Sequence, residues 1–158
     1  MPEQAIGGWH KHTTVNGAVE SVTVVPEGDE DIVYLIIRRT VKGEVVRYVE
    51  RMHERKFSAL EDAWCVDCGG EYIGDRTTEV KGLTWLEGET VNILADGCVL
   101  PQRVVEDGTV TLTQSARHVI VGLPITADLQ TLPVAVQLAD GSVGICLLYT
   151  SDAADDMQ

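Results

Sequence analysis

Two cysteines stand three positions apart in the segment Cys65-Val66-Asp67-Cys68. Thiolates at this spacing can hold one tetrahedral zinc ion, but a structural zinc site takes four ligands. The sequence has no second pair of this kind, and Cys98, His53 and His118 fit no usual zinc spacing with the first. A thioredoxin-type redox pair would require a strand followed by a helix, which is not indicated here. We therefore predict structural thiols and no metal site.

The histidines His10 and His12 flank Lys11 in a segment of alternating polarity that begins with Trp9. Residues two positions apart in a strand share a face, so this pair can bind a metal ion or sense pH. The other interpretation, which we adopt, is a polar surface on the face opposite Trp9.

Three carboxylates, Glu61, Asp62 and Asp67, lie close to Trp64 in the sequence. A carboxylate pair beside an aromatic wall is a feature of glycan-cleaving enzymes. The spacing fixes no separation and assigns neither an acid nor a base. Because the sequence also has no nucleophilic triad and no Gly-rich phosphate loop, we predict that the chain is not an enzyme, with no catalytic residues and no cofactor.

Four arginines lie on two neighbouring predicted strands: Arg38, Arg39, Arg47 and Arg51. Glu44 and Glu50 occupy the same strands. Opposite charges on adjacent strands favour cross-strand pairs. We interpret the arginines as partners in such pairs or in a subunit contact, rather than as a phosphate clamp.

The elements around these residues are predicted to be strands. Apolar and polar residues alternate with period two over residues 1–52, and the turn pairs Asn16-Gly17 and Lys42-Gly43 separate the runs. The pattern predicts a four-stranded antiparallel meander of the size of one propeller blade. Its strands are Ile6–Thr14, Val19–Val25, Asp31–Thr40 and Val45–Met52.

Residues 53–68 lose the alternation and begin with a charged run, so we predict a linker with a short helix. Residues 69–124 regain the strand pattern, with Asp96-Gly97 and Asp107-Gly108 as turns. Short strands at this spacing predict a small five-stranded β-barrel. Its strands are Leu83–Leu86, Thr90–Ala95, Cys98–Val105, Val110–Thr113 and His118–Leu123. The fold class is therefore all-β.

Residues 125–145 are predicted to be a connector followed by the start of a truncated β-hairpin, with Val134–Leu138 as its first strand and Asp140-Gly141 as its turn. The run CLLYTSDAADD, from Cys146 to Asp156, resembles the translation of a sequencing adapter. We expect the authentic polypeptide to end near Ile145, as in a truncated gene, and residues 146–158 to be disordered.

The chain is acidic, with 12 Lys and Arg against 25 Asp and Glu, and a net charge of −13. Without Asp152, Asp155 and Asp156 the balance is 12 against 22, or −10, so the acidity belongs to the main segment. An acidic surface repels phosphate, which argues against nucleic-acid binding through a basic groove. No apolar run approaches the roughly 20 residues that span a bilayer, and we expect no membrane anchor.

Several blocks occur in an order that resembles one protein family. Trp9-His10-Lys11-His12 precedes Val19–Val22 and the run IVYLIIRRTVKGEVVRYVERM, which spans Ile32–Met52. The later blocks are Leu60–Trp64, Gly82–Gly97 and Val121–Gln137. Together they resemble the tail tube, or nozzle, proteins of short-tailed bacteriophages, also called tail tubular proteins. The resemblance covers nearly the whole segment before Cys146.

The resemblance implies a virion structural protein of the phage tail that is assembled in the cytoplasm of the host bacterium. It implies a homo-oligomeric ring, a hexamer, whose partners are the head-to-tail connector and the tail fibre or spike proteins. DNA would leave through the lumen without sequence-specific binding. The predicted meander would end a propeller-type region. The barrel would resemble, in shape only, the first catalytic-cysteine half-domain of ubiquitin-activating enzymes.

Two other functions stay open at this point. The chain can be a receptor- or glycan-binding module of a tail, with Trp9, Trp64 or Trp85 as stacking platforms. A cell-wall hydrolase domain of a tail is the third possibility. An acidic wall favours the conduit, because strong phosphate contacts would slow the passage of DNA.

Overall fold

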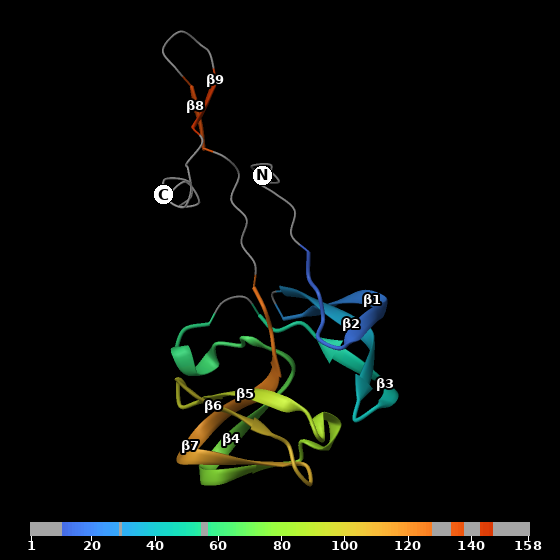
Figure 1. The fold of residues 1–158 in the computed structure, drawn as a ribbon, viewed down its shortest axis with the longest axis vertical. Helices are drawn as coiled ribbons and strands as arrows, with labels where there is room; N and C mark the ends of the chain where they lie inside the picture. The colour runs from blue at the N-terminus through green and yellow to red at the C-terminus, as the bar shows by residue number, and fades with distance from the viewer. Residues whose placement is uncertain (1–10, 29, 55–56, 128–133, 138–142, 147–158) are drawn as a thin grey trace, which may run out of the picture. The chain divides into compact units, whose positions relative to one another are not determined.

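A computed structural model describes residues 11–28, 30–54, 57–127, 134–137 and 143–146. These residues form β-strands with two short 3-10 helices, which confirms the predicted all-β class (Figure 1). The chain divides into two units, Met1–Ile125 and Thr126–Gln158. Among the described residues, no helix is long and apolar enough to cross a membrane.

The first sheet has the antiparallel order β1-β2-β3. Its strands are β1 (Gly17–Glu27), β2 (Glu30–Val41) and β3 (Glu44–Arg51). The turn between β2 and β3 places both Lys42 and Gly43 at positive φ, 51° and 81°, as a two-residue hairpin turn requires. Three of the four predicted meander strands are therefore present.

The remaining predicted meander strand, Ile6–Thr14, is wrong where the structure describes it. Residues 11–14 belong to no strand, and residues 6–10 lie outside the described part of the chain. The Thr14 hydroxyl and the Val15 amide instead donate hydrogen bonds to the Asp67 carboxylate, at 2.8 and 2.7 Å. A side chain from another segment thus takes the place of a neighbouring strand.

The second sheet has four strands in the order β4-β7-β5-β6, all antiparallel. They are β4 (Val66–Lys81), β5 (Thr90–Ala95), β6 (Cys98–Val104) and β7 (Thr109–Pro124). Within the described residues β4 and β6 are not paired with each other, so the sheet is open. The predicted five-stranded β-barrel is wrong on strand number, and no closed barrel is present among the described residues.

Two features explain the different strand count. The predicted strands Val110–Thr113 and His118–Leu123 are the two ends of the single strand β7. Leu83–Leu86, also predicted as a strand, contains the 3-10 helix η2 (Thr84–Leu86). The strand β4 begins inside the predicted linker 53–68, after the 3-10 helix η1 (Leu60–Asp62).

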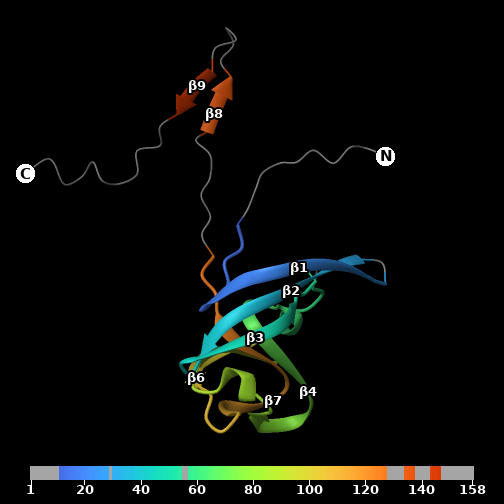
Figure 2. The same cartoon turned by 90° about the vertical axis from the view of Figure 1, so that its right-hand side faces the viewer.

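The main core lies on the second sheet and under η2. A Cβ atom at Gly122 would lie 2.8 Å from both the Asp67 carbonyl oxygen and the Gly69 Cα, so β7 and the start of β4 approach closely there. Figure 2 shows the first sheet as a layer against the second. The buried cluster comprises Val80, Leu83, Leu86, Val91, Ile93, Ala95, Leu100, Val105, Val110, Leu112, Ala116, Val119, Val121 and Leu123.

The second unit contains an antiparallel hairpin. Its strands are β8 (Val134–Gln137) and β9 (Val143–Cys146), and Val134 lies opposite Cys146. The predicted strand that starts at Val134 is thus present. The predicted turn at Asp140-Gly141 lies outside the described residues. Disorder was predicted for the adapter-like residues 146–158; Cys146 instead belongs to β9, and residues 147–158 lie outside the described residues.

Candidate functional site

The side chain of Arg39 is buried between the two sheets, with 0% of its surface exposed. Its Nε and Nη2 atoms donate to the two Glu50 carboxylate oxygens at 2.6 and 2.7 Å, and Nη2 also donates to Asp67 Oδ1 at 2.9 Å. Burial alone would lower the pKa of Arg39, but the hydrogen bond to Glu50 and the charge of Asp67 raise it overall. The guanidinium therefore stays charged.

Asp67 is fully engaged in joining the two sheets. Besides Arg39, it accepts hydrogen bonds from Thr14, from the Val15 amide and from its own neighbour, the Cys68 amide, the last at 3.0 Å. A carboxylate that accepts this many hydrogen bonds is held in one position. The sequence analysis groups Asp67 with Glu61 and Asp62, which lie near it along the chain. In the structure Asp67 instead belongs to a clamp formed by Arg39, Glu50 and Asp67, so its role differs from that of the other two carboxylates.

The predicted pairing of the arginines with glutamates of the neighbouring strands is confirmed for Arg39 and Glu50. The other three arginines pair with carboxylates that the sequence analysis did not name. Arg47 and Arg38 both contact Glu20, with nitrogen-to-oxygen distances of 2.8 and 3.4 Å, and Arg51 contacts Glu27 at 3.0 Å. The carboxylates of the outer pairs thus come from β1. The predicted partner Glu50 pairs with Arg39, whereas Glu44 is in none of the ion pairs that the structure gives to these four arginines.

The three cysteines of the first unit are free, and they differ in exposure: Cys65 and Cys98 are exposed and Cys68 is half-buried. Burial, followed by the negative charge of Glu50, raises the pKa of Cys68 to about 12. Because the thiolate is the reactive form, Cys68 is chemically quiet at neutral pH.

We expect iodoacetamide at pH 8 to alkylate Cys65 readily and Cys68 at least about 100-fold more slowly, since Cys68 is half-buried and its thiolate fraction is small. Mass spectrometry with fragmentation of the tryptic peptide 57–76 separates the two sites. In urea the two rates should become equal. Equal rates in the folded protein would contradict this prediction.

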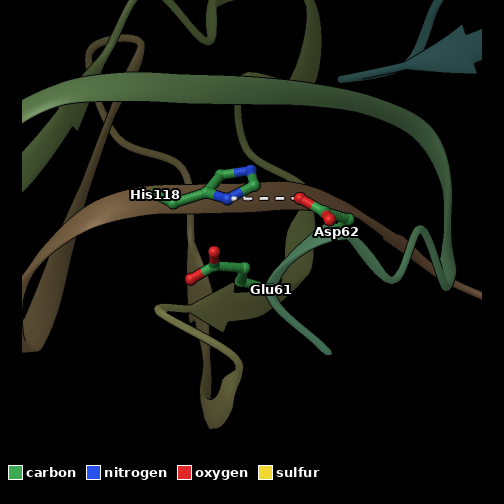
Figure 3. A group of neighbouring side chains, drawn as sticks. All are labelled: Glu61, Asp62 and His118. Carbon is green, nitrogen blue, oxygen red and sulfur yellow. Dashed lines mark ion pairs between the residues drawn. The ribbon is translucent and has the colours of Figure 1, made fainter. Parts of the chain in front are cut away.

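A second polar cluster lies where η1, in the segment that connects β3 to β4, meets β7. His118 of β7 places Nδ1 3.9 Å from Asp62 Oδ1, and its Nε2 lies 2.7 Å from Glu71 Oε1 of β4. Glu61 completes the group, since one ligand atom each of Glu61, Asp62 and His118 lie within 4.8 Å of one another. Figure 3 shows the two carboxylates and the imidazole gathered around one space.

The backbone at His118 is fixed by Asp96. The carboxylate of Asp96 accepts hydrogen bonds from the amides of His118 and Arg117, at 2.9 and 3.0 Å, and these bonds lower the pKa of Asp96. The side chain of His118 is 12% exposed. Its ring therefore has little freedom to leave the cluster.

The sequence indicates each member of this cluster as a candidate residue but does not indicate that the three lie together. Glu61 and Asp62 were grouped with Asp67, and His118 was considered as a partner of Cys65 and Cys68. In the described part of the chain, the one group of three or more potential metal ligands is Glu61, Asp62 and His118. No spacing signal links η1 to β7, because their contact depends on the path of the connector.

A cavity of about 1120 Å³ lies between the inner face of the first sheet and the start of β4. Its lining includes Tyr48, Trp64, Trp85 and His12. His53 stacks on Trp64 with ring centroids 4.6 Å apart and an angle of 7° between the planes. Two of the three predicted aromatic platforms thus line one space, whereas Trp9, like His10, lies outside the described residues.

The first sheet also presents large apolar side chains to solvent. On β3 and the central strand, Val45, Val49 and Ile36 are 58%, 75% and 40% exposed. Cross-strand register places them on one face, which we call the outer face, because Ile36 lies opposite Val49 and Thr40 opposite Val45. On β1, four valines are exposed: Val19, Val22, Val24 and Val25.

Comparisons with known proteins add no family assignment. No protein-family model matches the chain, and no curated protein matches it.

Proposed function

We propose that this chain is a non-enzymatic structural subunit that assembles with copies of itself, and that its assembly is the ring of a short-tailed phage tail tube through which DNA is ejected. The exposed apolar surface of the first sheet carries this proposal. The ordered sequence blocks that resemble nozzle proteins supply the biological setting, together with the expected connector and tail fibre or spike partners.

The exposure of β1 is the main support for assembly. Every residue from Gly17 to Pro26 is exposed, although the strand contains four valines. Among the described residues, this strand is paired on one side only, with β2. An apolar strand with an unpaired edge is a template for association, and exposed apolar patches mark interfaces.

The two edges of the first sheet differ, which suits a ring. β1 forms one edge and β3 the other, so a contact between β1 of one copy and β3 of the next joins two different surfaces. Contacts of this head-to-tail kind generate closed rings when the rotation between copies closes. The net charge of −10 that remains without the three adapter-like aspartates, 12 minus 22, suits a channel that releases DNA without holding it.

Val49→Lys tests the proposal, because it places a charge at the most exposed of the three apolar residues of the outer face. We expect the unmodified chain to form rings in negative-stain images and the variant to sediment as a monomer. Thr111→Lys is the control, since Thr111 is an exposed residue of the second sheet. A monomeric unmodified chain, or a Val49→Lys variant that keeps its rings with the same stability, would refute it.

The alternative is a receptor- or glycan-binding tail module, and the cavity is the observation that favours it. Trp64 and Trp85 line it together, and aromatic faces at the wall of a cavity are suited to sugar rings. A monomer that is retarded by bacterial surface polysaccharide in a gel, and loses this retardation in Trp64→Ala, would favour this alternative over the tube.

A further inference from the structure

We propose that Glu61, Asp62 and His118 form a binding site for a divalent first-row transition metal ion, with Glu71 as the residue that positions the histidine ring. The site is independent of the cysteines and of the assembly surface. It lies where the connector between the two sheets contacts β7, so a bound ion would fasten η1 to the second sheet.

The proton position on His118 is the first argument. Glu71 is a carboxylate, which accepts hydrogen bonds when ionised, and its Oε1 atom lies 2.7 Å from Nε2 of the ring. In the neutral imidazole the Nε2–H then donates to Glu71, and Nδ1 carries a lone pair. Metal-ligating histidines almost always donate their other ring N–H to such a partner.

The direction of Nδ1 is the second argument. Nδ1 lies 3.9 Å from Asp62 Oδ1, and the Glu61 carboxylate lies beside both (Figure 3). Nδ1 and one oxygen of each carboxylate are potential metal-ligand atoms, and they lie within 4.8 Å of one another. Because bonds of about 2.0 to 2.2 Å let two ligands of one ion lie up to about 4.4 Å apart, the 3.9 Å separation leaves room for a metal ion.

The ligand types indicate the class of ion. One imidazole with two carboxylates is a mixed set of nitrogen and oxygen ligands. Such a set suits manganese or zinc better than calcium or magnesium, which prefer oxygen ligands alone. The carboxylates are partly exposed, with 43% of the Asp62 side chain accessible, so water can fill the remaining coordination positions.

Manganese is the best probe, because thiolates prefer softer ions and Cys65, Cys68 and Cys98 will then not compete for it. Titration of the full chain with Mn²⁺, followed by the loss of the free-ion electron paramagnetic resonance signal, should give one ion per chain. The bound ion should broaden the ring resonances of His118 before those of His53. It should also raise the melting temperature, because it binds the folded state.

Three variants and one control test the assignment. His118→Gln and Asp62→Asn should each weaken Mn²⁺ binding at least tenfold, and Glu71→Ala should weaken it about 10- to 100-fold through loss of ring positioning. Asp75→Asn removes the same charge from β4 outside the cluster and should leave the affinity unchanged. All variants are compared only where circular dichroism matches the unmodified chain.

The proposal is overturned if Mn²⁺ does not bind stoichiometrically, or if Asp75→Asn weakens binding as much as Asp62→Asn. Broadening of His53 or His12 in place of His118 overturns it as well, and this readout needs no variant. Assembly of the chain into ring-shaped oligomers is measured separately from Mn²⁺ binding. Loss of the metal site therefore leaves the assembly proposal standing, and loss of assembly leaves the metal-site proposal standing.

Discussion

Replacement of Arg39 by methionine is expected to lower the free energy of unfolding by about 3 to 5 kcal/mol, the usual cost of removing one partner of a buried ion pair. Methionine fills similar space but leaves the carboxylates of Glu50 and Asp67 without their shared cation. The carbonyl of Val15, which Arg39 also contacts, loses a donor. Urea denaturation followed by circular dichroism measures the change.

Glu20→Gln is the matched control for an exposed ion pair. Glu20 contacts Arg38 and Arg47 on the outer side of the first sheet, where both arginines are about half exposed or more. Exposed pairs contribute little, so stability should hardly change. The clamp interpretation fails if Arg39→Met and Glu20→Gln have similar effects, or if Arg39→Met is as stable as the unmodified chain.

The clamp also bears on the proposed assembly. Arg39, Glu50 and Tyr48 point from the first sheet toward the second, and the Tyr48 hydroxyl donates to the Trp85 carbonyl at 3.0 Å. The sheet is therefore held by its inner face, which leaves Val45, Val49 and Ile36 on the outer face available to a neighbouring copy. A sheet fixed in this way presents a preorganised surface, which lowers the entropy cost of association.

Local alternation predicted most of the first sheet. In β3, Val46, Tyr48 and Glu50 are half-buried while the intervening residues are exposed, so burial follows the strand period of two. Polarity departs from this period at the exposed Val45 and Val49 and at the half-buried Glu50. The pairing of Arg39 with Glu50 was also predictable, because these opposite charges lie on neighbouring strands. The partners on β1 were not, since Glu20 and Glu27 reach across from a strand that is not adjacent to β3.

The second sheet was harder to predict because its longest strands are irregular. β4 contains Gly69, Gly70 and Gly74 and a polar run, and its register with β7 shifts in three places. Such a strand shows no clean alternation in the sequence. The pairing order β4-β7-β5-β6 then decides whether the sheet closes, and this long-range choice has no local signal.

Contacts between distant segments explain the remaining differences. Asp67 bonds to Thr14 across 53 positions, and His118 to Glu71 across 47. No sequence motif predicts either contact, because each depends on the path of the segment that connects β3 to β4. The candidate residues could be named from the sequence by type, whereas their grouping required the structure.

Leu86→Ala should be the other strongly destabilising change, with a loss of about 2 to 5 kcal/mol. Leu86 is 0% exposed and Leu83 is 3% exposed, although a strand would have turned them to opposite faces. The 3-10 helix η2 places residues three apart on one side, so both reach the core. Removing the Leu86 side chain leaves a cavity and loosens the turn that carries Trp85.

Thr84→Ala is the control that distinguishes the loss of core packing by Leu86 from a general sensitivity of η2 to substitution. Thr84 lies in the same helix and is exposed, so its substitution should change stability by no more than about 0.5 kcal/mol. Thermal and urea denaturation of both variants give the comparison. If Leu86→Ala unfolds at the same urea concentration as Thr84→Ala, then η2 does not anchor the core, and the strand predicted from the sequence for Leu83–Leu86 would regain support.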